Sequence, residues 1–352
     1  MRRKLTTIYA VICTLLLAAG FLLVFLLSWQ KGAWESVECL LGLAISIILS
    51  PIYHEIGHVF GAKIANFSCV YVKCFCFTFY RNQGKVKFRF SSPFAPDETQ
   101  VLPKSGGNML RRTKWYTVGG LLFGGAFLFL VLGGAIVCTA VGHTSYLLWG
   151  MIPYAAYLFL LNLPPVEYAS GKTDTLVYMG LKKGDPAEKN MLAAMEIQGQ
   201  LYEGKSFQEI DEKLYFDLPQ LCEDEPLFAV MLDLRYRYFL EKEEYEKAAD
   251  CLNRLAQAQA YLPEHEVEKL AAELTYMHAL RGDFESAEAS GKLCRAYLQS
   301  DEAAAKRTLL AFSKAFGKEE SIAPLKEQLA ECLENERIAG VKKFEELLCS
   351  RI

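Results

Sequence analysis

Residues 39–62 read CLLGLAISIILSPIYHEIGHVFGA, an apolar run interrupted by one cluster of His54, Glu55 and His58. Its length suits a membrane crossing, because a helix needs about 20 predominantly apolar residues to span the hydrocarbon core. Ionisable side chains are costly inside a membrane helix and usually mark a functional site that faces the interior of a bundle. The stretch therefore predicts a membrane-spanning helix that carries a functional site.

The cluster has the pattern His-Glu-x-x-His and uses two of the five histidines in the chain. Residues four positions apart lie on one face of a helix, so His54 and His58 can bind the same metal ion. Glu55 then lies beside the metal as a general base. The alternative is that the span ends at Pro51 and the cluster is an ordinary polar helix end in interfacial water. The apolar residues that follow His58 favour the membrane site.

Two further uncharged runs are long enough to cross a membrane. Residues 5–30 form one span, although a cleaved signal peptide is the alternative interpretation of this segment. Residues 115–166 suffice for two spans, with a turn at the polar break at 142–145. The expected fold is a mainly α, polytopic membrane protein with about four transmembrane helices. The predicted spans are 5–28, 38–61, 115–140 and 145–164.

Lys and Arg accumulate in the cytoplasmic loops of membrane proteins. The segment between the second and third predicted spans contains 10 of them, whereas the two predicted outer loops contain only Lys31. This distribution places both termini and the His-Glu-x-x-His cluster towards the cytoplasm.

Charge divides the chain into two chemically different parts. Residues 1–175 contain 15 basic and 7 acidic side chains, whereas the remainder contains 23 basic and 34 acidic side chains. We therefore predict a transmembrane domain at 1–180 and a cytoplasmic helical domain at 181–352. The lipid bilayer is an expected partner, and nucleic acid is not. The 11 cysteines include no Cys-x-x-Cys pair, so we expect reduced thiols.

Two further patterns concern regions outside the spans. Alternating apolar residues at 67–90, with a turn at 81–84, predict a small membrane-associated β-hairpin. The C-terminal domain contains a weak repeat with intervals of 38 and 39 residues. It resembles a tetratricopeptide-like helical array, which would offer a surface to a protein partner. A helical bundle that only stabilises the protein is the alternative. The aromatic or aliphatic positions that recur are Phe207, Tyr245, Phe284 and Ile322.

Catalytic zinc usually takes three protein ligands and leaves one position for water. Two histidines therefore require a partner from elsewhere in the chain, and the best candidate segment follows the last predicted span. Residues 161–174 read LNLPPVEYASGKTD. His-Glu-x-x-His in one span, together with Asn-x-x-Pro and a later Asp, resembles the two signatures of the site-2 protease family.

The resemblance implies an intramembrane zinc metalloendopeptidase. Asp174 would be the third zinc ligand, and Asn162 would lie near the zinc and hold the substrate backbone or the developing oxyanion. Asp174 lies farther from Pro165 than is usual in the family, and Thr175 stands where the family has Gly. Glu167 is therefore an alternative ligand.

The family also implies a class of substrate and a location. The substrates would be membrane-tethered regulators or remnant signal peptides, and the membrane would be a bacterial plasma membrane. The β-hairpin would pair with an unwound substrate strand, or it would simply rest on the membrane surface. The alternative function is a catalytically silent membrane adaptor that binds partners through its helical tail.

Overall fold

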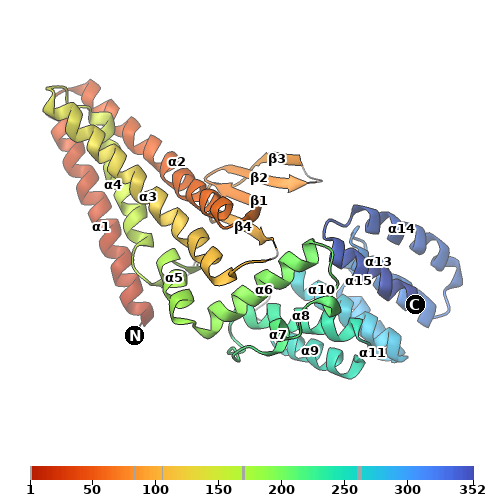
Figure 1. The fold of residues 1–352 in the computed structure, drawn as a ribbon. Coiled ribbons are helices and arrows are strands. Elements are labelled where there is room, and N and C mark those ends of the chain that lie inside the picture. Colours follow the sequence, from red (N-terminus) through yellow and green to blue (C-terminus); the bar gives the residue numbers. More distant parts are fainter. Residues whose placement is uncertain (1, 83–84, 105, 169–170, 260–263) are drawn as a thin grey trace. The chain divides into compact units, whose positions relative to one another are not determined.

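The computed structural model describes residues 2–82, 85–104, 106–168, 171–259 and 264–352 (Figure 1). The chain is mainly helical and divides into two compact units, Met1–Glu188 and Lys189–Ile352. The first unit contains the long apolar helices and a small sheet, and the second is built from shorter helices.

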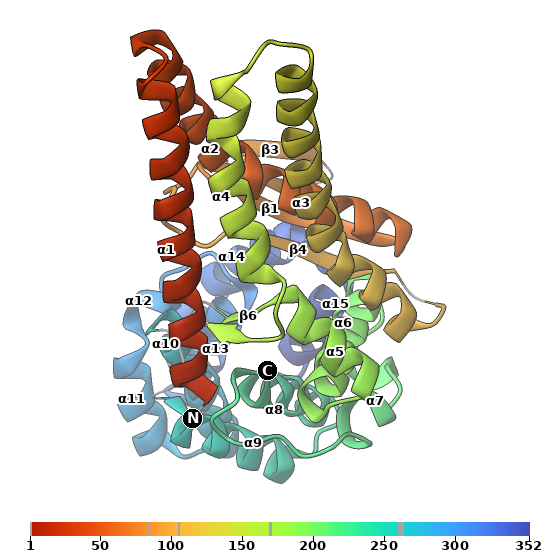
Figure 2. The ribbon, with the colours of Figure 1, turned by 90° about the vertical axis from the view of Figure 1, so that its left-hand side faces the viewer.

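Four helices of the first unit pack side by side (Figure 2). They are α1 (Arg2–Trp29), α2 (Ala33–Ile64), α3 (Met109–Ala140) and α4 (Tyr146–Asn162). The helices α1, α2 and α3 are long and apolar enough to cross a membrane, which agrees with three of the predicted spans. The helix α4 is apolar but has only 17 residues. At 1.5 Å per residue it is about 26 Å long, slightly less than the hydrocarbon core, so the fourth span stays a prediction.

Glycines allow α2 to approach its neighbours at backbone distance. A Cβ atom added at Gly57 of α2 would lie 2.2 Å from the carbonyl oxygen of Gly119 on α3. One added at Gly150 of α4 would lie 2.3 Å from the carbonyl oxygen of Cys39 on α2. Small residues are typical of such close contacts between membrane helices. These contacts fix the position of α2 against both neighbours and thereby position its histidines.

The outward faces of these helices are apolar. Leu15 of α1 is 63% exposed and Leu130 of α3 is 70% exposed. A large exposed apolar surface is unfavourable in water. It is favourable in hydrocarbon, which agrees with a membrane-embedded bundle.

The predicted hairpin is part of a four-stranded antiparallel sheet with the order β3-β2-β1-β4. The strands are β1 (Phe67–Cys74), β2 (Phe77–Asn82), β3 (Lys85–Phe90) and β4 (Glu98–Pro103). The strands β2 and β3 form the expected hairpin, although Gln83 and Gly84 of its turn lie outside the described residues. The structure adds β4 on the other side of β1, which the alternation pattern had not indicated.

The first alternating run is broken into two strands by a turn at Phe75, where the backbone has a φ of 53°. Asp97 stabilises this turn, because its Oδ1 accepts the N–H of Phe75 at 2.7 Å and pairs with Lys73 Nζ at 3.0 Å. Lys73 is buried, and its ammonium also donates to the carbonyl of Ala95 at 2.6 Å. The chain is thereby returned from β3 to β4.

The second unit contains successive pairs of packed helices. The pairs are α8 (Pro226–Glu241) with α9 (Tyr245–Gln257), α10 (Glu264–Arg281) with α11 (Phe284–Leu293), and α13 (Ala303–Ala315) with α14 (Ile322–Asn335). Three of the recurring positions, Tyr245, Phe284 and Ile322, are the first residue of the second helix in a pair. The repeat thus coincides with a structural unit, while the tetratricopeptide assignment stays a prediction.

The remaining helices of the unit are α6 (Pro186–Tyr202, which begins in the first unit), α7 (Lys213–Phe216), α12 (Arg295–Leu298), α15 (Ala339–Ser350) and the short 3-10 helices η1 (Phe207–Glu209) and η3 (Glu319–Ser321).

A buried charged cluster joins the helices of this unit. Arg307 of α13 is fully buried, and its Nη2 donates to both carboxylate oxygens of Glu273 on α10, at 2.7 and 2.6 Å. Its Nε lies 3.4 Å from the carboxylate of Glu345 on α15. Tyr236 of α8 donates its hydroxyl to Glu273 at 2.7 Å. A buried charge needs such partners because its desolvation is costly.

Candidate metal centre

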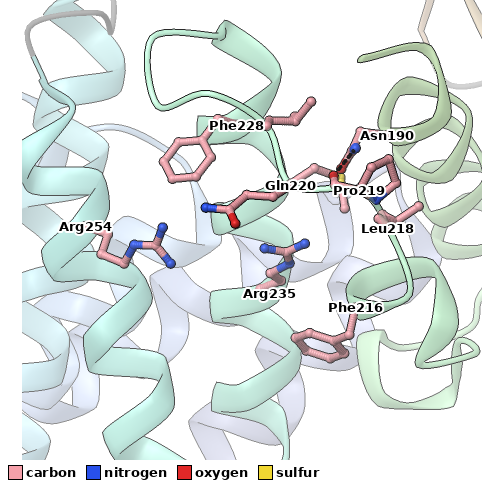
Figure 3. A pocket seen from close by; sticks show the side chains of 10 residues that line it. Asn190, Phe216, Leu218, Pro219, Gln220, Phe228, Arg235 and Arg254 are labelled. Atoms are coloured by element: carbon pink, nitrogen blue, oxygen red, sulfur yellow. Dashed lines mark hydrogen bonds between the residues drawn. The ribbon is translucent and has the colours of Figure 1, made fainter. Parts of the chain in front are cut away.

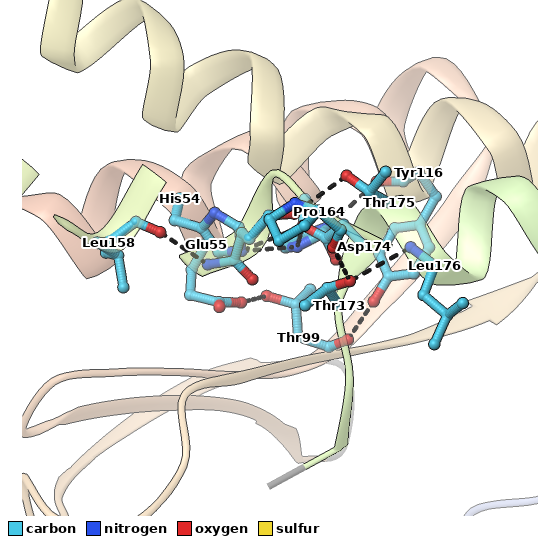
Figure 4. A network of polar contacts seen from close by, with 12 residues as sticks. His54, Glu55, Thr99, Tyr116, Leu158, Pro164, Thr173, Asp174, Thr175 and Leu176 are labelled. Atoms are coloured by element: carbon cyan, nitrogen blue, oxygen red, sulfur yellow. Dashed lines mark hydrogen bonds and ion pairs between the residues drawn. The ribbon is translucent and has the colours of Figure 1, made fainter. Parts of the chain in front are cut away.

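Three potential ligand atoms from two distant parts of the chain converge on one point (Figure 4). His54 and His58 lie one turn apart on α2, and Asp174 is the first residue of α5 (Asp174–Lys183). The Oδ2 atom of Asp174 lies 3.3 Å from Nε2 of His54 and 3.4 Å from Nε2 of His58. The two Nε2 atoms are 3.3 Å apart. The three atoms therefore form a nearly equilateral triangle.

This triangle has the size that a tetrahedral zinc site requires. Around an ion with bonds of about 2.0 to 2.1 Å, neighbouring ligand atoms are roughly 3.3 to 3.4 Å apart. Oδ2 of Asp174 is buried and has no hydrogen-bond partner among the described residues. Buried polar atoms rarely lack a partner, so an orphaned one calls for an explanation such as a bound ion. The group can hold a metal ion, and its two imidazoles and one carboxylate suit zinc.

The surroundings of His58 leave its Nε2 atom available to a metal. Nδ1 of His58 lies 3.1 Å from the backbone carbonyl of Tyr116 on α3, a position in which an Nδ1–H donates to that oxygen. Such a bond leaves the lone pair on Nε2, as is common for histidines that bind metals. A Cβ atom at Gly120 of α3 would lie 2.4 Å from Nε2 of His58 and 2.8 Å from Cε1 of His54. Glycine at this position gives both rings their space.

The chain between α4 and α5 returns Asp174 to the histidines. A two-stranded ribbon, β5 (Glu167–Tyr168) and β6 (Gly171–Lys172), accounts for the long spacing between Pro165 and Asp174. Residues 169 and 170 at its tip lie outside the described residues. The unusual spacing is thus accommodated by a local excursion of the chain that ends at the metal group.

Thr173 fixes the point at which the ribbon becomes a helix. Its hydroxyl donates to the carbonyl of Pro164 at 2.8 Å and accepts the N–H of Leu176 at 3.3 Å, which makes it the N-cap of α5. The N–H of Val166 also reaches this oxygen at 3.3 Å. An N-cap fixes the first turn of a helix. Asp174, the first residue of that turn, is thereby held in place.

The electrostatics of the group favour an ionised Asp174. Burial on its own would raise the pKa of this carboxyl. The proximity of His58 and His54, whose Nε2 atoms lie 3.4 and 3.3 Å from Oδ2, outweighs burial and lowers the pKa below its usual value. A carboxylate that is ionised at neutral pH is ready to act as a metal ligand.

Glu55 is buried beside the histidines and is held by a residue that the sequence did not indicate. Its Oε2 accepts the hydroxyl of Thr99, on β4, at 2.5 Å. The hydroxyl of Tyr116 in turn donates to the backbone carbonyl of Thr99. The sheet therefore orients the carboxylate of Glu55 through its last strand. No signal in the sequence could have identified Thr99, because β4 itself was not predicted.

Asn162 and Glu167 occupy different surroundings. Asn162 ends α4 and, with His54, lines a small cavity of about 10 Å³, close to the space that one water molecule needs. Its amide donates to the carbonyl of Leu158 in the preceding turn at 3.2 Å. Glu167 lies on β5, is exposed and does not belong to the group of potential ligands. The geometry therefore brings Asn162 near the site and leaves Glu167 outside it.

No protein-family model matches the sequence, and no curated protein or solved structure is significantly similar to the chain. The functional interpretation accordingly depends on the geometry of the metal group and on the apolar helix that carries it.

Proposed function

We propose that the protein is an intramembrane zinc metalloendopeptidase of the site-2 protease type. The observation that carries this proposal is the triangle of His54, His58 and Asp174 ligand atoms, 3.3 to 3.4 Å apart, whose two histidines lie on a helix apolar enough to cross a membrane. The substrate is a membrane-spanning or membrane-tethered protein, or a remnant signal peptide. The site faces the cytoplasm in a bundle that crosses a bacterial plasma membrane four times.

Each residue of the site has a distinct task in this proposal. His54, His58 and Asp174 would hold a zinc ion, which would supply Lewis acidity towards water and the scissile carbonyl. Glu55, oriented by Thr99, accepts the proton of the attacking water and passes it to the leaving amine. Asn162 lies at the cavity beside His54, where its amide can hold the substrate backbone or the developing oxyanion. Tyr116 holds His58 through its backbone carbonyl.

The ligand set is tested by the zinc content of the purified full-length protein. Asp174→Ala removes one of three ligands, so we expect the bound zinc to fall from about one ion per chain to nearly none. Glu167→Ala is the matched control, because it removes a neighbouring carboxylate from the exposed β5 strand and should leave the zinc in place. The metal is measured by plasma mass spectrometry after dialysis. Loss of zinc in Glu167→Ala and retention in Asp174→Ala would contradict the ligand assignment.

A further inference from the structure

The second unit contains a cavity of about 310 Å³ that has no part in the proposed proteolysis (Figure 3). This volume lies at the lower end of the range of small-ligand sites, which is about 300 to 1,000 Å³. The loop before α8 forms one wall, and Asn190 of α6 anchors that loop by donating to the carbonyl of Pro219 at 2.9 Å. The apolar lining comes from Phe216, Leu218, Pro219, Leu221, Phe228 and Met231.

Two arginines supply the charge of this cavity, and an aromatic ring holds each guanidinium. The Cζ atom of Arg235, on α8, lies 5.7 Å from the ring centre of Phe216. That of Arg254, on α9, lies 5.2 Å from the ring centre of Phe228. Cation–π contacts of this kind fix the plane of a guanidinium. Both guanidinium groups point towards the side chain of Gln220, which also lines the cavity (Figure 3).

Only some of the hydrogen-bond donors of these two guanidinium groups have partners among the described residues. Arg235 donates its Nε to the carbonyl of Tyr215 at 2.8 Å, and this is its only hydrogen bond recorded in the described part of the chain. No carboxylate of that part lies within ion-pair distance of Arg235. Arg254 has one carboxylate within this distance, that of Glu223, which is 3.5 Å away and belongs to a side chain that is 73% exposed. The terminal nitrogens of Arg235 thus remain available to a ligand.

The charge balance defines the ligand further. Arg235 and Arg254 are the charged side chains of the lining, and Glu223, which offsets part of the charge of Arg254, lies outside it. Burial and, more weakly, the charge of Arg254 lower the pKa of Arg235, against an opposing contribution from Cys251. Arg307 in the same unit differs, because carboxylate oxygens of Glu273 and Glu345 lie 2.6 and 3.4 Å from its nitrogens. An anion would therefore complete the charge balance at the cavity.

We propose that this cavity binds a monocarboxylate that carries an apolar or aromatic group. The carboxylate lies between Arg235 and Arg254, since a guanidinium matches the two oxygens of a carboxylate with two parallel hydrogen bonds. The apolar group lies against Phe228, Leu221 and Met231. A free organic acid and the C-terminal residue of a peptide share this chemistry. The proposal makes no use of the metal centre, so it stands or fails independently of the proposed protease activity.

The first experiment is calorimetric titration of the full-length protein in detergent with N-acetyl-phenylalanine and with its amide. We expect the acid to bind at least about tenfold more tightly than the amide, because only the acid offers a charge to the arginines. A peptide that ends in phenylalanine with a free carboxylate identifies the source. Tighter binding of this peptide than of the single acid indicates a peptide terminus, and equal binding indicates a small molecule. Equal affinity for acid and amide, no binding of the acid, or tighter binding of phenyl phosphate would overturn the proposal.

The second experiment locates the binding with variants. Arg254→Gln should weaken binding of the acid at least about tenfold, and Arg235→Gln should weaken it by a similar factor. Arg295→Gln is the matched control, because Arg295 is an exposed arginine of the same unit that does not line the cavity. Circular dichroism reports whether each variant is folded. If Arg235→Gln fails to fold, Arg254→Gln decides the matter, because that side chain is 38% exposed and its loss disturbs little packing. Undiminished binding to a folded Arg254→Gln variant would overturn the proposed location.

Discussion

Glu55 differs from a metal ligand in what its removal should do. Its carboxylate is buried, accepts the Thr99 hydroxyl and does not belong to the ligand triangle. Glu55→Gln should therefore leave zinc bound, because the amide has nearly the same shape and the three ligand atoms are untouched. Cleavage of a co-expressed membrane substrate should fall at least about a hundredfold, since general acid–base catalysis contributes about 10² to 10⁴. Immunoblotting of the substrate measures the cleavage, and undiminished cleavage would remove Glu55 from the mechanism.

Gly120 offers a residue-scale test of the metal centre that leaves all proposed ligands in place. A Cβ atom there would lie 2.4 Å from Nε2 of His58, so Gly120→Ala must displace the ring or the metal. We expect this variant to lose most of its zinc. Gly133→Ala is the control on the same helix, because a Cβ atom at Gly133 meets nothing within 4 Å. Alanine is the better helix former at both positions, so a general loss of helix stability is not expected. Equal zinc content in the two variants would contradict the placement of His58.

At the scale of elements, the ribbon and the cap of α5 determine whether Asp174 reaches the histidines. The Thr173 hydroxyl makes three hydrogen bonds, to Pro164, Val166 and Leu176, and its side chain is buried. Thr173→Val keeps the shape and removes these bonds, which should cost about 1 kcal/mol or more at this cap. We expect zinc affinity to fall about tenfold or more, within the range known for residues that orient metal ligands. A competition titration with a chelator measures this affinity.

Serine provides the control for this cap, because Thr173→Ser keeps the hydroxyl and removes only a methyl group. Its zinc affinity should stay within a few-fold of the parent protein. If Thr173→Val bound zinc as tightly as Thr173→Ser, the cap would have no part in positioning Asp174.

At the scale of the whole molecule, four crossings would place the turn after α3 and the C-terminal unit on opposite sides of the membrane. In a background without native cysteines, a cysteine at the exposed His143 should react with an impermeant maleimide added to intact cells. A cysteine at the exposed Lys292 should react only after the cells are permeabilised. Mass-tagged maleimide and gel mobility measure both reactions. Labelling of both positions from one side would show that α4, with its 17 residues, does not cross.

Local patterns in the sequence were sufficient wherever the structure depends on neighbouring residues. The apolar runs predicted α1, α2 and α3 because a span is a property of about 20 consecutive residues. The spacing of His54 and His58 placed them on one face because the helical repeat is short. The beginning of β4 and its contact with Glu55 were not predictable in this way, since Thr99 is 44 positions from Glu55.

The sequence by itself determined the apolar helices, the division of the chain into a basic and an acidic part, and the local pair of histidines. Each of these follows from composition or from helical periodicity. Tertiary structure alone decided that Asp174 and not Glu167 lies within reach of that pair. It also decided that Gly120 lies against both imidazole rings and that Arg235 and Arg254 line one cavity. The physical reason is that such contacts depend on how closely helices approach and on where a ribbon or loop returns the chain, and no local pattern encodes those distances.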